Sequence, residues 1–178
     1  MLPRVWDKPV GDIALTNCST YREIAIEACE ISRDLLDAGR RPKDNGGWVL
    51  SYDPERRSFK SACIAIVFAG VWFEAAAHLA FVERHGPAGA KEFDHLTYED
   101  KLKSLGCSDS ALIEQARRIR QARKELVHEK AYLDYGQLRP AQGEAENAHQ
   151  FLLALSDERG RLILANPTDH SPNGGSST

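Results

Sequence analysis

The sequence has no excess of basic residues. Its 23 lysines and arginines stand against 26 aspartates and glutamates, which gives a formal net charge of −3 at pH 7. Proteins that bind nucleic acid over much of their surface are usually strongly basic, so any site for a polyanion in this chain has to be local. The 178 residues suffice for one domain with a real core, and a hydrophobic content of 42% excludes a disordered chain.

The sequence also lacks the spacings that indicate a metal site. Its four cysteines form no C-x-x-C pair, and no pair of histidines accompanies them at a zinc-binding spacing. Glu74 and His78 are four residues apart and could share a metal ion, but the pattern supplies no third ligand. The first residues, MLPRVWDKPVGD, do not read as a secretory leader, so we expect reduced cysteines and a cytoplasmic protein. We expect no metal and no other cofactor.

Long hydrophobic runs are scarce as well, and only residues 58–85 raise the question of a membrane span. Between Ala62 and Val82 the strongly polar residues are Glu74 and His78 alone. Two ionisable side chains in mid-segment are costly in a lipid bilayer, and no second run of this kind exists. The run therefore predicts a central helix that other helices cover, with Glu74 and His78 buried, and no membrane partner.

Other segments have the periodicity or the punctuation of helices and loops. Glycine, proline and charge between residues 39 and 57 predict a long loop, in which "WVL" forms a short strand or a flap. Helical patterns cover residues 20–38, a short segment with a capping-box-like start at Thr97, a long segment from about Asp109 to Leu133 and a last one from about Glu144 to Asp157. The cap of the long segment is either Asp109 or Ser108. The side chains expected in the core are Tyr21, Ile24, Ala28, Ile31 and Leu35 in the first helix and Ala148, Phe151, Leu152 and Leu155 in the last.

Together these elements predict an all-α fold, an antiparallel bundle of four main helices plus one short helix. The helical domain would span residues 20–158. An N-terminal extension, residues 1–19, would precede it, and a C-terminal extension with a disordered tail, residues 159–178, would follow.

The helix predicted from Asp109 carries an arginine where its pattern calls for an apolar side chain. At about 100° per residue from Leu112, the core stripe comprises Ala116, Ile119 and Leu126 within about 40° and Val127 near 60°. Arg123 falls at about 20°, inside this stripe. An isolated buried charge is costly, so its guanidinium requires a carboxylate, a polar interface or a ligand.

Beside this stripe, four cations share one side of the helix. At roughly 80° to 160° on the same scale lie Arg120, Lys124, Arg117 and His128. We call them the basic ridge. It is either a local polyanion site in an otherwise acidic protein or an ordinary solvated face that glutamates partly compensate. Those glutamates are Glu114, Glu125 and Glu129.

The segment from Arg123 to His128, RKELVH, resembles the signature of the HEPN family (higher eukaryotes and prokaryotes nucleotide-binding). That signature is an arginine and a histidine separated by four to six residues on a late helix of a small α-helical bundle. The apolar run also resembles the family's hydrophobic helix, with "FEA", containing Glu74, at its acidic position. The resemblance covers roughly residues 20–158.

The resemblance implies metal-independent RNA cleavage, in which the ribose 2′-hydroxyl attacks the adjacent phosphate and leaves a 2′,3′-cyclic phosphate. His128 would serve as general acid or base, and Arg123 would orient the phosphate and offset charge in the transition state. Arg117, Arg120 and Lys124 would contact RNA. Because roughly 140° separates Arg123 from His128 on an ideal helix, the family's habit of forming the site across a homodimer matters here.

Two residues near this motif have open roles. Glu74 either pairs with Arg123 as a buried structural ion pair or orients the catalytic groups. Lys124 stands where many active members have Asn, Asp or His, and a lysine cannot accept a hydrogen bond as those residues can.

Two functional hypotheses follow. The first is a HEPN ribonuclease, either a toxin with a nucleotidyltransferase-type antitoxin as its partner or another antiviral effector. The second is a catalytically silent HEPN module that binds nucleotide, RNA or a protein partner. The arginine and histidine of the motif favour the first, and Lys124 with the negative net charge favours the second.

Overall fold

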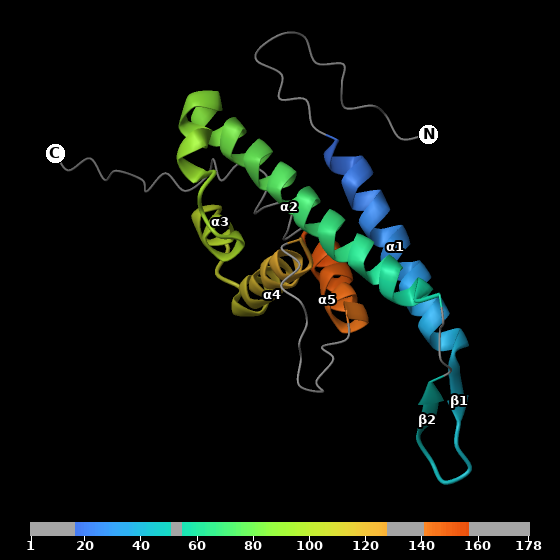
Figure 1. The fold of residues 1–178 in the computed structure, drawn as a ribbon. Helices are drawn as coiled ribbons and strands as arrows, with labels where there is room; N and C mark the ends of the chain where they lie inside the picture. The colour runs from blue at the N-terminus through green and yellow to red at the C-terminus, as the bar shows by residue number, and fades with distance from the viewer. Residues whose placement is uncertain (1–16, 51–54, 128–140, 157–178) are drawn as a thin grey trace, which may run out of the picture.

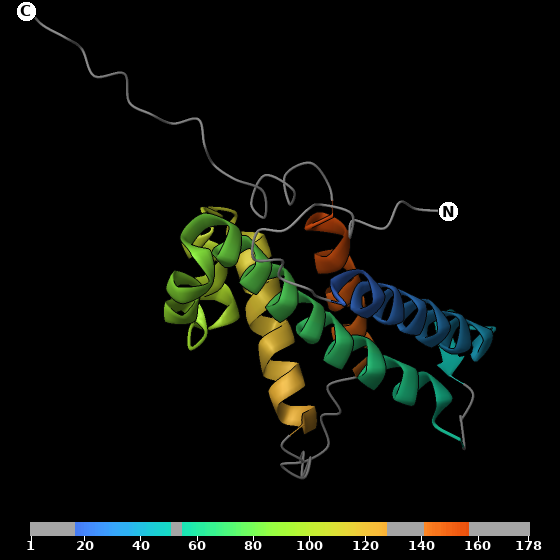
Figure 2. The same cartoon turned by 90° about the horizontal axis from the view of Figure 1, so that it is seen from above.

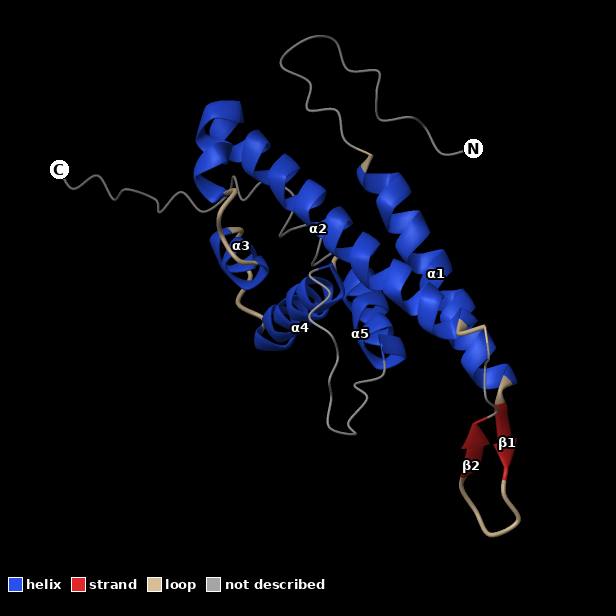
Figure 3. Cartoon of the chain, in the orientation of Figure 1, coloured by secondary structure: helices blue, strands red, loops and turns tan. Residues whose placement is uncertain are grey.

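The structure, a computed structural model, describes residues 17–50, 55–127 and 141–156, and within these ranges it is almost entirely helical (Figures 1 and 3). This confirms the predicted all-α class. The elements are α1 (Cys18–Ala38), β1 (Arg40–Pro42), β2 (Trp48–Leu50), α2 (Arg57–Ala90), the 3-10 helix η1 (Lys91–Phe93), α3 (Tyr98–Ser104), α4 (Ser110–Val127) and α5 (Ala141–Ala154).

Helices α1 and α2 lie side by side and run antiparallel (Figures 1 and 2). Small residues line their contact, among them Ala25 and Cys29 of α1. Ser32 and Ser58 each donate a hydrogen bond to the other's backbone carbonyl, both at 3.0 Å. The expected core position of Ile31 is wrong, because this side chain is half-exposed. Small side chains let the two backbones approach closely, which turns the large isoleucine outward.

Helix α2 is the centre of the fold and contributes much of the core, including the fully buried Phe73 and Phe81. By length and composition alone, the helical stretch 57–93 is long and apolar enough to cross a membrane, but 56% of its most apolar window is buried within the protein. Core helices pass the same test of composition. The expected burial of Glu74 and His78 is wrong, since both side chains are partly exposed.

The end of α2 turns sharply at Gly86, whose φ of 70° and ψ of 170° suit glycine, and Pro87 follows it. The turn brings η1 back onto α2. The rings of Phe81 and Phe93 stack with their centroids 4.0 Å apart, and the ring of His85 lies 4.9 Å from that of Phe93.

The later helices begin at the predicted caps. Thr97 accepts a hydrogen bond from the Asp100 amide at the start of α3, and the Asp109 carboxylate accepts from the amides of Ala111 and Leu112 at the start of α4. Helices α4 and α5 pack obliquely against α2 (Figure 2). All four core residues expected in the last helix are buried, namely Ala148, Phe151, Leu152 and Leu155.

Strands β1 and β2 form an antiparallel hairpin that extends beyond the ends of α1 and α2 (Figures 1 and 3). It confirms the short strand predicted at "WVL", although the sequence did not reveal its partner β1. Arg41 lies opposite Val49, and Pro42 lies opposite Trp48.

Several predictions fall on residues outside the described ranges. They are the continuation of the long helix to Leu133, the motif histidine His128, most of the N-terminal extension, and the C-terminal extension with its tail.

Candidate functional site at the end of helix α4

Arg123 of α4 has two close neighbours, one on α2 and one at the start of α3. Its Nη1 donates a hydrogen bond to the Tyr98 hydroxyl at 2.9 Å. Its aliphatic stem passes directly over Gly70 of α2, where a Cβ would lie only 2.5 Å from Cδ of Arg123. Any larger residue at position 70 would collide with the arginine. Gly70 thus makes the arginine's place on the packed side of α4 possible.

Tyr98 is the residue of this site that pattern reasoning missed. It is buried at the start of α3, its ring packs against Phe73 with centroids 4.9 Å apart, and its hydroxyl donates to the Gly70 carbonyl at 3.3 Å. Burial and, second, the nearby Glu74 carboxylate raise the pKa of Tyr98 to about 12, although the Arg123 guanidinium acts to lower it. The phenol therefore stays neutral and orients Arg123 as a hydrogen-bond acceptor. The only available signal was a tyrosine in the first turn of a short capped helix.

The predicted ion pair between Glu74 and Arg123 is wrong. Glu74 forms its ion pair with Lys101 of α3, whose side chain is only 6% exposed. A buried ammonium needs a close carboxylate, and Lys101 approaches Glu74 from the neighbouring helix. The Tyr98 hydroxyl stands between Glu74 and Arg123 and interacts with both.

Glu74 also lines a cavity of about 590 Å³ between α2, η1 and α3. Its polar wall consists of the Glu74–Lys101 pair and of His78, whose Nδ1 lies 3.4 Å from a carboxylate oxygen of Asp94. Glu74 and His78 thus both have protein partners. Among the described residues, no group of three or more His, Cys, Asp or Glu side chains is arranged to hold a metal ion.

Arg120 of the basic ridge forms an ion pair that links α4 to α3. Its Nη2 and Nε donate to the two carboxylate oxygens of Glu99 at 2.6 and 3.0 Å. Burial alone would raise the pKa of Glu99, but the hydrogen bonds from Arg120, a hydrogen bond from the backbone and the charge of Arg120 together leave that pKa below its ordinary value. The positive charge of Arg120 is therefore neutralised by a fixed partner.

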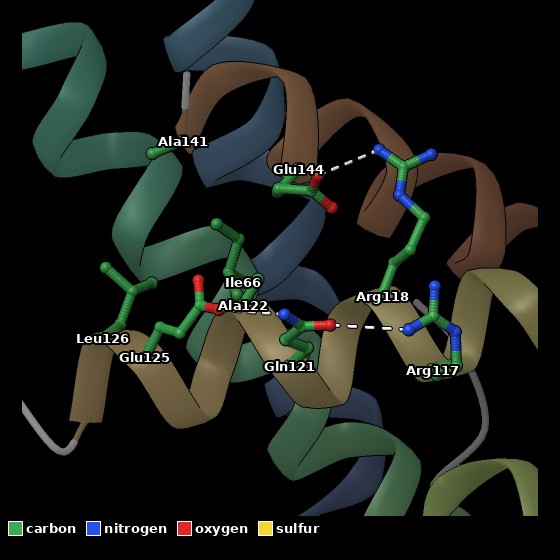
Figure 4. Close-up of a pocket in the computed structure, with 9 residues that line it drawn as sticks. All are labelled: Ile66, Arg117, Arg118, Gln121, Ala122, Glu125, Leu126, Ala141 and Glu144. Atoms are coloured by element: carbon green, nitrogen blue, oxygen red, sulfur yellow. Dashed lines mark hydrogen bonds and ion pairs between the residues drawn. The ribbon is translucent and has the colours of Figure 1, made fainter. Parts of the chain in front are cut away.

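The arginines before it are neutralised as well. Arg117 donates from Nε to the exposed carboxylate of Glu114 at 2.7 Å, and Nη2 of Arg118 lies 3.0 Å from the Glu144 carboxylate of α5. Figure 4 shows Arg117, Arg118 and Glu144 around a cavity of about 310 Å³ between α4 and α5, with Gln121 hydrogen-bonded to both Arg117 and Glu125.

Arg123 and Lys124 differ from these three arginines. Within the ranges that the structure describes, neither has a carboxylate within 4.0 Å, and the buried Nε of Arg123 has no hydrogen-bond partner. Lys124 is exposed. The expected core position of Val127 is wrong, because this last side chain of α4 is more than half-exposed. The end of α4 thus presents two cations that no described carboxylate neutralises, immediately before His128.

Comparisons of the chain with protein-family models, with curated proteins and with solved structures find no match in any of the three.

Proposed function

We propose that the protein is a HEPN-like endoribonuclease that acts on RNA by attack of the 2′-hydroxyl on the adjacent phosphate. One observation carries the proposal: Arg123 is fixed by Tyr98 and Gly70, yet no carboxylate of the described residues neutralises it. A cation held in place but unpaired is suited to an anionic ligand, and a phosphate accepts hydrogen bonds from a guanidinium in a planar, directional way.

In the proposed reaction, Arg123 binds the scissile phosphate and offsets the charge that develops on its oxygens. His128 removes the proton of the 2′-hydroxyl or protonates the 5′-oxygen that leaves, a task suited to an imidazole that titrates near neutral pH. The products are a 2′,3′-cyclic phosphate and a 5′-hydroxyl. Lys124 contributes a second positive charge beside the phosphate.

A homodimer belongs to this proposal. On an ideal helix, roughly 140° separates Arg123 from His128, so one helix presents them to different sides. A second copy whose α4 faces the first would combine the arginine of one protomer with the histidine of the other. In a toxin setting, a nucleotidyltransferase-type antitoxin would be the protein partner that suppresses the activity, and the protein would act in the cytoplasm.

A catalytically silent module is the second candidate, and the paired arginines favour it. Arg120 is neutralised by Glu99 and Arg117 by Glu114, which leaves a smaller cationic surface for RNA than the ridge alone indicates. Such a module would bind nucleotide, short RNA or a protein through Arg123 and Lys124 without cleaving. Lys124→Asn, which restores the common family residue, should keep or raise cleavage if the protein is an enzyme.

Cleavage of labelled single-stranded RNA tests the proposal. Wild type should generate products that end in cyclic phosphate, and EDTA should leave the rate unchanged. His128→Ala should lower the rate by about 10² to 10⁴, as expected for loss of general acid–base catalysis.

Arg41→Ala is the matched control, because it removes an exposed cation of β1 far from α4. It should cleave like wild type. Binding of RNA without cleavage by the wild-type protein would refute the ribonuclease and support the silent module.

A further inference from the structure

The hairpin of β1 and β2 is a two-stranded sheet with two chemically different outer edges. Hydrogen-bonded and non-hydrogen-bonded residue pairs alternate along an antiparallel ladder. The Lys43 amide donates to the Gly47 carbonyl at 3.1 Å, so this pair is hydrogen-bonded, and two residues further on so is the Arg41–Val49 pair. The residues between them, Pro42 and Trp48, therefore direct their backbone groups away from the hairpin.

The outer edge of β1 is blocked. Its outward positions are Pro42, which has no N–H to donate, and the charged Arg40, and Arg41 adds a second charge to the strand. Proline and charge are the usual means by which an edge strand is protected from pairing.

The outer edge of β2 is open. By the same alternation, Trp48 and Leu50 both direct an N–H and a C=O outward, and within the described residues these groups have no hydrogen-bond partner. The strand contains no charged residue. Trp48 is 64% exposed and Val49 45% exposed, so these two apolar side chains are uncovered. Isolated two-stranded hairpins are marginal in water, which makes a third strand favourable here.

We propose that β2 pairs with β2 of a second copy of this chain, in antiparallel orientation about a two-fold axis through Val49. In this register Trp48 lies opposite Leu50 of the second copy. Each copy contributes two N–H donors and two C=O acceptors, so the two copies form four backbone hydrogen bonds. The result is a continuous four-stranded sheet with the protected β1 strands at its two outer edges. The edge is complementary to itself, as a two-fold interface requires.

A second copy suits this edge better than a flexible peptide does. Only two residues of the edge offer hydrogen bonds. A free peptide would lose conformational entropy when it becomes ordered on this edge, and so few hydrogen bonds would hardly offset that loss. A second hairpin is already ordered by its own β1. It also brings exposed apolar residues near the hairpin end of α1 and α2, Ile31 and Phe59, that can add to the contact.

Directed cross-linking tests the register. In the proposed pairing Val49 lies opposite itself in a non-hydrogen-bonded pair, where Cα atoms are about 4.5 Å apart, which is within disulfide range. In a protein whose half-buried Cys18 and Cys63 are replaced by serine, Val49→Cys should form a disulfide-linked dimer on mild oxidation. The matched control Arg41→Cys should not, because two β1 strands would be roughly 14 Å apart across the sheet.

A second measurement needs no cysteine. Leu50→Pro removes an outward N–H and leaves the hydrogen-bonded pair between Arg41 and Val49 intact, so it should weaken dimerisation on the order of tenfold or more in sedimentation equilibrium. Leu50→Ala keeps the N–H and should weaken it less. Circular dichroism checks that both variants fold.

The proposal is overturned by a monomer at high micromolar concentration, which would leave the edge to a different protein. It is also overturned by a dimer that Leu50→Pro does not weaken, or by equal cross-linking through positions 41 and 49. A monomer would also count against the composite Arg123–His128 site of the proposed ribonuclease, whereas the other two outcomes concern the β2 edge alone and leave that proposal to the cleavage test.

Discussion

The middle of α4 and the part nearer its C-terminal end carry the same kind of side chain in different surroundings. Arg117 and Arg120 each bind a carboxylate of the protein, and Arg120 does so with both oxygens of Glu99. Arg123, less than one turn later, contacts a neutral phenol and a glycine. Positive charge in the sequence is therefore not the same as positive charge available to a ligand. The local fold divides the cations of α4 into structural cations and unpaired ones.

The largest expected effect separates these two classes by activity. Arg123→Ala should lower RNA cleavage on the order of 10² to 10³, since it removes a group that stabilises the transition state. Arg120→Ala should lower cleavage by less than about tenfold, because Glu99 already neutralises it. Initial rates with the same labelled RNA measure both. Equal losses would mean that the cations of α4 act together and that the difference between paired and unpaired arginines has no functional meaning.

The next effect concerns the space that Gly70 leaves for Arg123. Gly70→Leu should reduce the free energy of unfolding by about 1–3 kcal/mol, the usual cost of an overpacked core position. In an Arg123→Ala background the same change should cost less, because the obstructing side chain is gone. Urea unfolding of the four proteins in this cycle provides the measurement, and purely additive effects would show that the two residues do not meet.

A smaller effect should come from the neighbouring Glu74–Lys101 pair. Glu74→Gln should reduce stability by about 1–2 kcal/mol, since it leaves the buried ammonium without its counter-charge but Glu74 itself is partly exposed. The loss should couple strongly to Lys101→Met and only weakly to Arg123→Ala. Chemical denaturation decides between the two partners. Stronger coupling to Arg123 would restore the ion pair that the sequence predicted.

The smallest expected effect is a pH dependence from the paired half of the ridge. The pKa of Glu99 is lowered in the folded protein, so its ion pair with Arg120 contributes stability above the unfolded value of about 4.3. That contribution is lost as the pH falls through the lower folded value. Glu99→Gln should therefore flatten the acid side of the stability curve measured by thermal unfolding between pH 3 and 6, roughly the window in which a carboxylate titrates.

The exposed pair of Glu114 and Arg117 is the matched control for this measurement. Glu114→Gln should change the acid slope less, because solvent screens that pair more strongly. An equal change in both variants would contradict the distinction between the buried and the exposed pair.

Helix positions and caps could be predicted from the sequence because they depend on local chemistry. Asp109 caps α4 and Thr97 caps α3 as their side chains predict, and the apolar face of α5 is correct at Phe151 and Leu152. The all-α class follows from the same periodicity. These features need no knowledge of which helix faces which.

The errors arise where the partner lies on another element. The sequence predicts an ion pair between Glu74 and Arg123 because both are ionisable residues within apolar faces. Periodicity along one helix cannot reveal that α3 supplies Tyr98 as the partner of Arg123 and Lys101 as the partner of Glu74. The buried face predicted for α1 is wrong at Ile31 for a related reason. A pattern of hydrophobic residues favours large apolar side chains as the core, whereas the α1–α2 contact consists of small residues and leaves Ile31 exposed.

The sharp turn at Gly86 has a consequence for the order in which the chain folds. It returns Phe93 onto Phe81, a stacked pair only twelve positions apart in the sequence. Closing so short a loop takes well under a microsecond, whereas pairing α1 with α5 requires contacts across more than a hundred residues. The C-terminal end of α2 can therefore fold as an independent nucleus before the rest of the chain has formed its long-range contacts. On that route, the central helix acquires a fixed C-terminal end before its neighbours arrive to cover it.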